Sequence, residues 1–335
     1  MGYKKILITD KVHPLLIEGL ESENCLVTYD TTMDNAKLDE VIHQFDGIII
    51  NSKIIMTKAR IDKGKKLLFI GRLGSGLEII DVIYAKKKKI AVYNSPEGNR
   101  NAVAEHEFGM LLALMNNIVR ADAEVRKFHW DREKNRGKEL KGKTIGIIGL
   151  GHTGSSFAEK LSPWGLKVVS YDKYRKRYPP SLRFVEKVSL KELAETSDII
   201  SLHLPLTEET KFLVDDEFMS LCKKGVIICN TSRGQVIKTS SLIEGLETGK
   251  VGGACLDVFE NEKPESYSEQ EKVMYEKLYL MENVVLTPHI AGWTNESLSG
   301  IAVILLDKIL KGNHLKNVSG DTKIEIFEAK ILLKQ

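Results

Sequence analysis

The segment KTIGIIGLGHTG, residues 143–154, gives the clearest indication of the fold. A β-branched, apolar run leads directly into the spacing G-x-G-x-x-G, and an amphipathic stretch predicted to be helical follows at 155–164. Gly149 permits the tight turn, Gly151 lets the backbone approach a pyrophosphate, and Gly154 lets helix and strand pack closely. This context predicts a dinucleotide-binding loop with phosphate at the helix N-terminus. A glycine cluster that serves only helix packing is the alternative interpretation.

An acidic residue follows the next predicted strand. The run Leu166–Tyr171 ends at Asp172, 18 residues after the last glycine of the loop. A carboxylate at this position can accept hydrogen bonds from both hydroxyls of an adenosine ribose and would repel a 2′-phosphate. The sequence therefore predicts a preference for NAD over NADP, which Lys173, Arg175 and Lys176 could soften by pairing with a phosphate.

Short apolar runs occur on both sides of the glycine loop, with helical or connecting stretches between them. Alternating strands and helices predict parallel sheets, and 335 residues allow two domains. We expect an α/β fold with two Rossmann-like or flavodoxin-like parallel-sheet domains separated by a cleft, where a substrate would bind at the strand ends. The predicted strands outside the loop region are Ile6–Thr9, Cys25–Tyr29, Gly47–Asn51, Leu67–Gly71, Ile90–Tyr93, Ile199–Leu202, Val226–Cys229, Val251–Leu256 and Val284–Leu286.

Two long helices are expected to hinge the domains. One begins near Asn101 and runs toward Phe128, and the other is Asn295–Leu310.

Composition excludes several classes of function. The net charge is +3, and the dense basic run Lys86–Lys89 is interpreted as a solvated helix end rather than a nucleic-acid site. No apolar run reaches transmembrane length and no signal peptide opens the sequence, so no membrane partner is expected. The cysteines form no C-x-x-C pair, so we expect reduced thiols in a cytoplasmic protein, without zinc or disulfides. They are Cys25, Cys222, Cys229 and Cys255.

Polar motifs follow three predicted strands beyond the glycine loop. They are NTSRG at 230–234, DVFENE at 257–262 and TPHIAGW at 287–293. A guanidinium such as Arg233 can hold a substrate carboxylate, and an imidazole such as His289 can exchange a hydroxyl proton. A carboxylate such as Glu262 can orient that imidazole and raise its pKa. Each residue alone is better explained by a structural role, a surface salt bridge for Arg233 or Glu262 and a loop histidine for His289, but together they predict hydride transfer at a 2-hydroxy or 2-keto acid.

These motifs, in this order, resemble those of the D-isomer-specific 2-hydroxyacid dehydrogenases over nearly the whole chain. Further matches are GRLGSGLE at 71–78 with the family's carboxylate loop, NSPEGN at 94–99, AVAEH at 102–106 and HLPLTEET at 203–210. The resemblance implies a split substrate domain, residues 1–100 plus 291–335, and an NAD-binding Rossmann domain at 101–290. It also implies a homodimer formed through residues 98–143, with Phe128 and Trp130 in the interface.

The resemblance also assigns residue roles. His289 would be the acid/base, Glu262 its partner and Arg233 the substrate anchor. The implied NAD contacts are Gly149, Gly151, His152, Thr153, Gly154, Asp172, His203, Leu204, Pro205, Thr231, Ser232, Asp257 and Gly292. The expected substrate contacts are Lys53, Arg72, Ser75, Gly76 and Leu77, together with Arg233 and His289.

Within the family, the sequence is most similar to short-form D-3-phosphoglycerate dehydrogenases. This implies oxidation of 3-phospho-D-glycerate to 3-phosphohydroxypyruvate, a step of serine biosynthesis, without a C-terminal regulatory domain. The phosphate would need cations, for which Lys53 and Arg72 are the candidates, although Lys53 is equally well explained as a solvated loop lysine. The chain departs from the family's pattern at Ala291, at Trp293 and at the extra Lys263.

These departures leave the substrate open. A glyoxylate/hydroxypyruvate or D-lactate-type reductase is the alternative within the enzyme class. A binding protein that senses NAD(H), similar to the dehydrogenase-like corepressors, is the alternative of another class.

Overall fold

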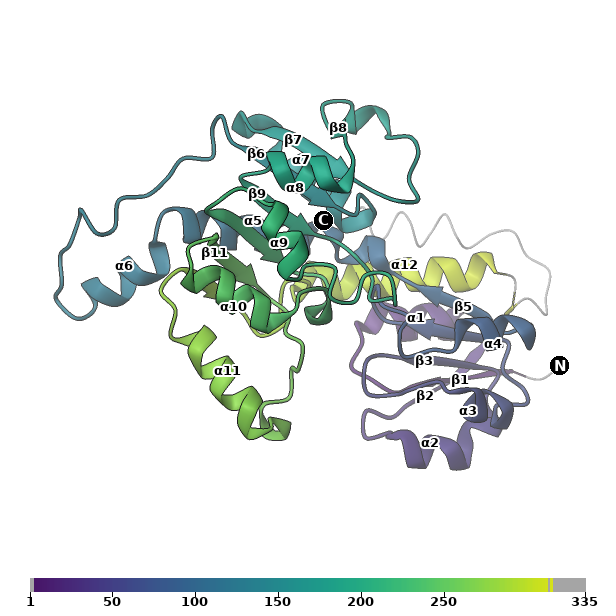
Figure 1. Cartoon of the computed structure of the whole chain (residues 1–335). Helices are drawn as coiled ribbons and strands as arrows, with labels where there is room; N and C mark the ends of the chain where they lie inside the picture. Colours follow the sequence, from purple (N-terminus) through teal and green to yellow (C-terminus); the bar gives the residue numbers. More distant parts are fainter. Residues whose placement is uncertain (1–2, 313, 316–335) are drawn as a thin grey trace. The chain divides into compact units, whose positions relative to one another are not determined.

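The computed structural model describes residues 3–312 and 314–315, and the chain divides into two compact units. Unit 1 comprises Met1–Ser95 and Ile301–Gln335, and unit 2 comprises Pro96–Gly300. Residues 1–2, 313 and 316–335 of the predicted substrate domain lie outside the described residues. Each unit contains a sheet in which all described strand pairs are parallel, which confirms the predicted α/β class (Figure 1).

Unit 1 is built on a five-stranded sheet in the order β2-β1-β3-β4-β5. The order reverses between β1 and β3, so the loops after these two strands flank the switch point of the sheet. The elements of unit 1 are β1 (Lys4–Ile8), α1 (Pro14–Ser22), β2 (Cys25–Tyr29), α2 (Asn35–Val41), η1 (Ile42–Gln44), β3 (Gly47–Ile50), α3 (Lys58–Lys63), β4 (Phe69–Arg72), α4 (Val82–Lys87) and β5 (Ala91–Asn94). The final helix, α12 (Asn295–Lys311), lies mainly in this unit.

Alternate residues of these strands face opposite layers of helices. Ile6 and Ile8 of β1 pack in the cluster that contains Leu305 of α12, whereas Leu7 packs in the cluster that contains Leu38 of α2. Figure 1 shows helices on both faces of the sheet. Because both faces are covered, the central strand β3 is apolar and buried throughout, as expected for a buried parallel sheet.

Unit 2 is built on a seven-stranded sheet in the order β12-β11-β10-β9-β6-β7-β8. The order reverses between β6 and β9, so the crevice at the carboxyl ends of these two strands is the expected ligand site. The strands are β6 (Thr144–Ile148), β7 (Lys167–Tyr171), β8 (Glu186–Lys187), β9 (Ile199–Leu202), β10 (Val226–Asn230), β11 (Val251–Leu256) and β12 (Val284–Leu286).

The helices of unit 2 cover both faces of this sheet. One buried cluster joins Ile147 of β6 to Leu111 of α5 and Phe157 of α7, and the other joins Ile148 to the helices of the opposite face. The helices are η2 (Pro96–Gly98), α5 (Arg100–Met115), α6 (Ile118–Val125), α7 (His152–Leu161), η3 (Ser162–Trp164), η4 (Pro180–Leu182), α8 (Leu190–Thr196), α9 (Asp216–Leu221), η5 (Gly234–Val236), α10 (Thr239–Glu247), η6 (Pro264–Ser266) and α11 (Glu269–Tyr279).

The prediction of one helix from Asn101 to Phe128 is wrong. Helix α5 ends at Met115, and α6 begins only at Ile118. Asn117 adopts a left-handed backbone with φ of 54°, which breaks the helix because asparagine tolerates this conformation better than most residues. The short edge strand β8 was not predicted, since two charged residues carry no strand pattern.

All four cysteines are buried and unpaired. Burial raises the pKa of the Cys25 and Cys222 thiols to about 11. Among the described residues, no helix is both long enough and apolar enough to cross a lipid bilayer.

Candidate active site

The glycine loop connects β6 to α7 at the switch point of unit 2. Gly149 has φ of +90°, and its amide donates to the Tyr171 carbonyl at 2.8 Å. A Cβ at Gly149 would lie 2.4 Å from the carbonyl oxygen of His203, and one at Gly154 would lie 2.1 Å from the Gly149 oxygen. Any side chain at these two positions would therefore collide with backbone. The tight turn and the close helix packing predicted from the sequence are both present.

Gly151 differs from the other two glycines, because a Cβ there would meet nothing within 4 Å. It caps α7, whose first turn begins at His152. The backbone of this turn thus borders open space, where unpaired N–H groups of a helix N-terminus can hold a phosphate. This geometry fits a dinucleotide. His152 is exposed and lies 3.8 Å from Glu97, and Thr153 is half-buried.

The carboxylate of Asp172 is engaged with backbone amides. Its Oδ2 accepts from Leu150 N at 2.8 Å, and its Oδ1 accepts from the amides of Tyr174 and Arg175 at 2.9 and 2.8 Å. The Arg175 guanidinium donates to the Leu150 carbonyl and, at 2.7 Å, to Ser155 Oγ. Asp172 therefore braces the glycine loop from the end of β7, and its predicted contact with a ribose stays a prediction.

The segment after β9 borders the same turn. His203 donates its amide to Ile148 at 2.8 Å, and its side chain is 2% exposed. Burial lowers the pKa of His203, and the nearby charge of Glu107 opposes this only in part. Leu204 is half-buried beside Gly149, and Pro205 is exposed. His203 is thus a neutral, buried residue, and its backbone forms one wall of the glycine turn.

The loop after β10 is organised by Asn230, which is fully buried. Asn230 Oδ1 accepts from the amide and hydroxyl of Ser232 at 3.0 and 2.8 Å, and Nδ2 donates to the Arg233 carbonyl at 2.9 Å. A Cβ at Gly234 would lie 1.9 Å from the Phe259 backbone, so this loop packs directly on the one that follows β11. The tight fit sets the position of Arg233.

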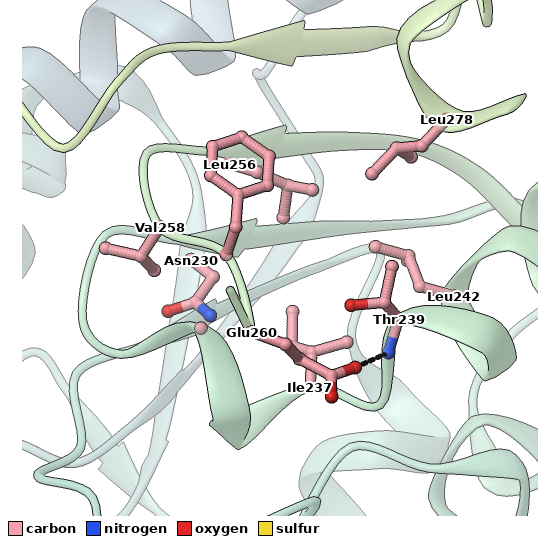
Figure 2. Close-up of a pocket in the computed structure, with 10 residues that line it drawn as sticks. Asn230, Ile237, Thr239, Leu242, Leu256, Val258, Glu260 and Leu278 are labelled. Atoms are coloured by element: carbon pink, nitrogen blue, oxygen red, sulfur yellow. Dashed lines mark hydrogen bonds between the residues drawn. The ribbon is translucent and has the colours of Figure 1, made fainter. Parts of the chain in front are cut away.

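A small pocket beneath these two loops is shown in Figure 2. Glu260 accepts a hydrogen bond from the backbone amide of Thr239 at the start of α10, at 2.5 Å, and the figure marks this bond between the two labelled residues. The pocket is otherwise lined mainly by apolar side chains such as Leu242 and Leu256. Glu260, two residues before Glu262, therefore binds the first amide of α10 and supports the loop that follows β11.

The extra Lys263 is accommodated in a turn built on Asn261. Asn261 Oδ1 accepts from Lys263 N at 3.0 Å. The Asn261 main chain is held by two tyrosines: its amide donates to Tyr275 Oη at 3.0 Å, and its carbonyl accepts from Tyr267 Oη at 3.2 Å. The insertion thus leaves Glu262 on a braced segment.

Asp257 organises the loop that carries the histidine. Its buried carboxylate accepts from the Thr287 hydroxyl at 2.6 Å and from the amides of Ile290 and Ala291 at 2.8 Å each. Its carbonyl accepts from His289 N at 2.7 Å. The resulting backbone holds His289 at φ of 55°, a left-handed conformation that a non-glycine residue adopts only when its surroundings enforce it.

The structure brings Glu262 and His289 together. His289 Nδ1 lies 2.8 Å from Glu262 Oε2, and the two side chains are 50% and 38% exposed. The hydrogen bond to Glu262 raises the pKa of His289 against the opposing effect of burial. Burial favours a higher pKa for Glu262, but the bond to His289 and the charge of Arg233 hold it below the usual value. An ionised carboxylate therefore supports a protonated imidazole.

Unit 1 holds the predicted carboxylate loop, residues 71–78, which begins in the last two residues of β4 and continues beyond it. Gly74 N donates to Ser95 Oγ at 3.1 Å, Ser95 N donates back to the Gly74 carbonyl at 2.9 Å, and Asn94 Nδ2 donates to the Ser75 carbonyl at 2.7 Å. Gly76 is buried and Leu77 half-buried. The loop backbone is therefore fixed by the end of β5.

The two predicted phosphate ligands of unit 1 have acceptors within that unit. Lys53 Nζ donates to the Thr31 carbonyl at 2.7 Å and lies 3.9 Å from Asp10 Oδ1. The guanidinium of Arg72 donates to the Leu73 carbonyl. A phosphate would have to compete with these acceptors.

Two functional candidates on α5 were missed by sequence reasoning. His106 Nε2 lies 3.0 Å from Thr287 Oγ1, and Glu107 is fully buried against Ser201 in β9 and Thr231 directly after β10. From the sequence alone, an acidic residue on a helix is expected to be exposed to solvent. The burial of Glu107 follows only from the packing of α5 on the sheet. Gly292 lies beside Asn99: a Cβ built on the glycine would be 2.7 Å from the Asn99 side-chain nitrogen.

Comparisons with known proteins agree with this geometry. Residues 108–291 match the family model described as "D-isomer specific 2-hydroxyacid dehydrogenase, NAD binding domain". The chain is 38% identical to a hydroxypyruvate reductase of Thermotoga maritima, over 93% of this chain and 99% of that protein. It is 36% identical to a D-3-phosphoglycerate dehydrogenase of Methanocaldococcus jannaschii, over 94% of this chain and 59% of that protein.

A solved D-lactate dehydrogenase from Aquifex aeolicus, complexed with NAD and lactic acid, superimposes with a TM-score of 0.81 at 30% identity, covering 92% of this chain and 96% of that one. The chain thus spans little more than half the length of the archaeal phosphoglycerate dehydrogenase but nearly all of the other two relatives. Because the family model matches more than half of the chain and the Thermotoga maritima relative matches over nearly its whole length, the chain belongs to the D-isomer-specific 2-hydroxyacid dehydrogenase family.

Proposed function

We propose that this chain interconverts a 2-keto acid and its D-2-hydroxy acid with NAD(H), using His289 as the acid/base. The observation that carries this proposal is the 2.8 Å contact between His289 Nδ1 and Glu262, with Arg233 close enough to lower the pKa of both. All three residues follow carboxyl ends of strands in the sheet that also carries the glycine loop. This is where open α/β sheets bind ligands.

The residues divide the reaction between them. NAD(H) held by the glycine loop would supply the hydride for a keto acid or accept the hydride of a hydroxy acid. Because Nδ1 of His289 faces Glu262, Nε2 remains to give a proton to the carbonyl oxygen or to take one from the hydroxyl. Glu262 holds the tautomer and stabilises the imidazolium, and Arg233 binds the substrate carboxylate in a fork. One hydride added at the carbonyl carbon and one proton added at the carbonyl oxygen together complete the reduction of the keto acid to the hydroxy acid.

We propose the remaining predicted contacts on the same basis. Thr231, Ser232, Asp257 and Gly292 border the loops that carry Arg233 and His289, which supports roles at the nicotinamide end. The backbone amides of the loop at 71–78 in unit 1 suit a substrate carboxylate. Unit 1 would serve as the substrate domain and unit 2 as the NAD domain, corresponding to the predicted ranges 1–100 with 291–335 and 101–290.

For the substrate we propose 3-phospho-D-glycerate and 3-phosphohydroxypyruvate, with Arg72 and Lys53 as phosphate ligands. The phosphoglycerate dehydrogenase similarity supports this choice. A second candidate, reduction of hydroxypyruvate, is favoured by two observations. The Thermotoga maritima relative named for that activity matches over 99% of its length. Both proposed phosphate ligands already have acceptors in unit 1.

The test is NADH turnover on phosphohydroxypyruvate, hydroxypyruvate, glyoxylate and pyruvate, with kcat/KM compared. A preference for phosphohydroxypyruvate supports the serine-biosynthesis assignment. A preference for hydroxypyruvate or glyoxylate overturns it and leaves the dehydrogenase standing. NADH binding without turnover of any of these acids would support instead a protein that senses NAD(H).

We also propose a homodimer formed through residues 98–143. Large apolar side chains are exposed on α6 and the segment after it, where Phe128 is 96% and Trp130 75% exposed. Ile118 and Val119 add to this surface at 53% and 57%. Exposed aromatic residues are typical of interfaces. Sedimentation should give twice the chain mass, and the double variant Phe128→Ser, Trp130→Ser should give the monomer.

The four unpaired cysteines support a reducing compartment such as the cytoplasm.

A further inference from the structure

Glu107 is one of only two charged residues that are buried in the described part of the chain. The other, Asp257, is explained by the three hydrogen bonds through which its carboxylate holds the His289 loop. Burying a carboxylate is costly unless it is hydrogen-bonded, so the position of Glu107 requires a reason. None of the roles assigned above uses it.

The partners of Glu107 come from the ends of two strands. The hydroxyl of Ser201 on β9 donates to its Oε1, and the hydroxyl of Thr231, directly after β10, donates to its Oε2. His203 Nε2 lies 2.7 Å from Ser201 Oγ and 3.8 Å from Glu107 Oε2. The His203 ring also packs on Phe157 of α7, with ring centroids 5.4 Å apart.

Each partner belongs to a segment that contacts the proposed cofactor site. The backbone of His203 forms the wall of the Gly149 turn, where a Cβ would come within 2.4 Å of its carbonyl. Thr231 is followed immediately by Ser232 and Arg233. A single carboxylate on α5 therefore fixes the end of β9 and the end of β10 to one helix.

We propose that Glu107 is a positioning residue for the cofactor, and that its buried negative charge favours the oxidised form over the reduced one. It acts through Thr231 and, by way of Ser201, through His203. This inference rests on the proposed role of Thr231 at the nicotinamide end. The nicotinamide ring is positively charged in NAD⁺ and neutral in NADH, so a fixed carboxylate on the far side of Thr231 stabilises only the former.

The groups around Glu107 leave its negative charge uncompensated, so its effect on the cofactor is preserved. Burial lowers the pKa of His203, so the histidine is neutral and does not cancel the charge of Glu107. Within residues 3–312 and 314–315, the groups that donate hydrogen bonds to the carboxylate are the hydroxyls of Ser201 and Thr231, and no lysine or arginine pairs with it. A buried carboxylate acts over a longer distance than a surface charge, because water screens it less.

The experiment compares dissociation constants for NAD⁺ and NADH in wild type and Glu107→Gln. Glutamine keeps the shape and can bond to both hydroxyls after one of them turns. We expect NAD⁺ affinity to fall at least about fivefold more than NADH affinity, corresponding to ~1 kcal/mol. Glu107→Asp keeps the charge and should restore the ratio of the two constants toward the wild-type value.

Glu105→Gln provides the matched control. Glu105 is on the same helix but 62% exposed, and it pairs with Lys160 at 3.0 Å. Removing this charge should leave the ratio unchanged, since solvent screens it. If Glu107→Gln weakens both cofactor forms equally, or only lowers the melting temperature, the charge effect is absent and the inference is overturned.

A second variant covers the case in which Glu107→Gln does not fold. Thr231→Val removes the hydroxyl bond between Glu107 and the loop after β10 while the charge remains. It should weaken binding of both cofactor forms about fivefold, the effect of one lost hydrogen bond, with the ratio retained. Wild-type binding by this variant would overturn the inference. Failure of wild type to bind NAD(H) would instead overturn the proposed function.

Discussion

In each of the two sheets, polar loops follow the carboxyl ends of the strands, but the side chains of these loops are held differently in the two units. In unit 2, buried Asn230 and Asp257 fix the loops, and the proposed reacting groups contact each other, as in the pair Glu262 and His289. In unit 1, Ser95 and Asn94 fix the backbone of the loop at 71–78, while the cations proposed for substrate binding contact carbonyls of their own unit.

This difference suits a family whose members share one reaction type but differ in the substrate they accept. In the proposed function, the arrangement in unit 2 would determine the reaction type, because an acid/base, its carboxylate and an anchor work on any 2-keto acid. The side chains of unit 1 would determine which acid is accepted, and small changes among flexible cations can alter such a choice. Variants in unit 2 should therefore affect turnover of every substrate, and variants in unit 1 should affect some substrates more than others.

The largest expected effect is in unit 2. Replacing His289 by alanine should lower turnover of every 2-keto acid by ~10²–10⁴-fold, the range typical of a lost general acid or base. NADH binding should remain nearly unchanged, because the glycine loop is not touched. The measurement is kcat on each acid together with a fluorescence titration of NADH. His43→Ala, at an exposed position of unit 1, is the control. Retention of most activity by the His289 variant would remove the basis for the triad.

The matching variant in unit 1 is Arg72→Ala. If Arg72 binds phosphate, the KM for phosphohydroxypyruvate should rise about 10- to 100-fold, as expected for the loss of a charge-assisted contact of ~1.5–3 kcal/mol. The KM for hydroxypyruvate should change far less. Steady-state kinetics with both acids measures this split, and exposed Lys66→Ala serves as a control. An equal change for both acids would assign Arg72 to the loop backbone rather than to phosphate.

Cofactor choice belongs to unit 2 and should not depend on the substrate. The carboxylate of Asp172, fixed by three backbone amides, would repel a 2′-phosphate. We expect kcat/KM to be at least about tenfold higher with NADH than with NADPH, or ~1.4 kcal/mol. The same ratio should be obtained with each keto acid. Equal values for the two cofactors would show that Arg175 or its neighbours compensate for Asp172.

A smaller effect is expected for Glu262→Gln. The hydrogen bond to Glu262 is the main cause of the raised pKa of His289. A histidine that loses its carboxylate partner gives up its proton at lower pH, so the alkaline fall in kcat/KM for keto-acid reduction should move to lower pH. A pH profile of wild type and variant measures the shift. A profile that stays in place would mean that another group controls the titration.

The sequence predicted the local parts of this structure well. The glycine turn depends on residues close in the chain, and the Arg, Glu and His motifs follow apolar runs that could be recognised as strands. The NAD-binding domain and the parallel sheets are confirmed. Asn116 and Asn117 interrupt an apolar stretch, but the sequence does not show that Asn117 adopts a left-handed conformation and ends the helix.

The parts that could not be predicted depend on packing between distant segments. Glu107 meets Ser201 and Thr231, which lie 94 and 124 residues away in the chain. The engagement of Asp172 by three amides and of Lys53 by the Thr31 carbonyl also depends on how loops fold back. Residue type gives no information about such partners.

The proposed roles of Arg233, Glu262 and His289 require stereospecific hydride transfer to a 2-keto acid. Chiral analysis of the product that wild type forms from NADH and the best keto acid of the four tests this requirement. We predict one D-2-hydroxy acid formed for each NADH consumed. Formation of the L-acid, of a racemate, or of no hydroxy acid while NADH is consumed would overturn the proposed function.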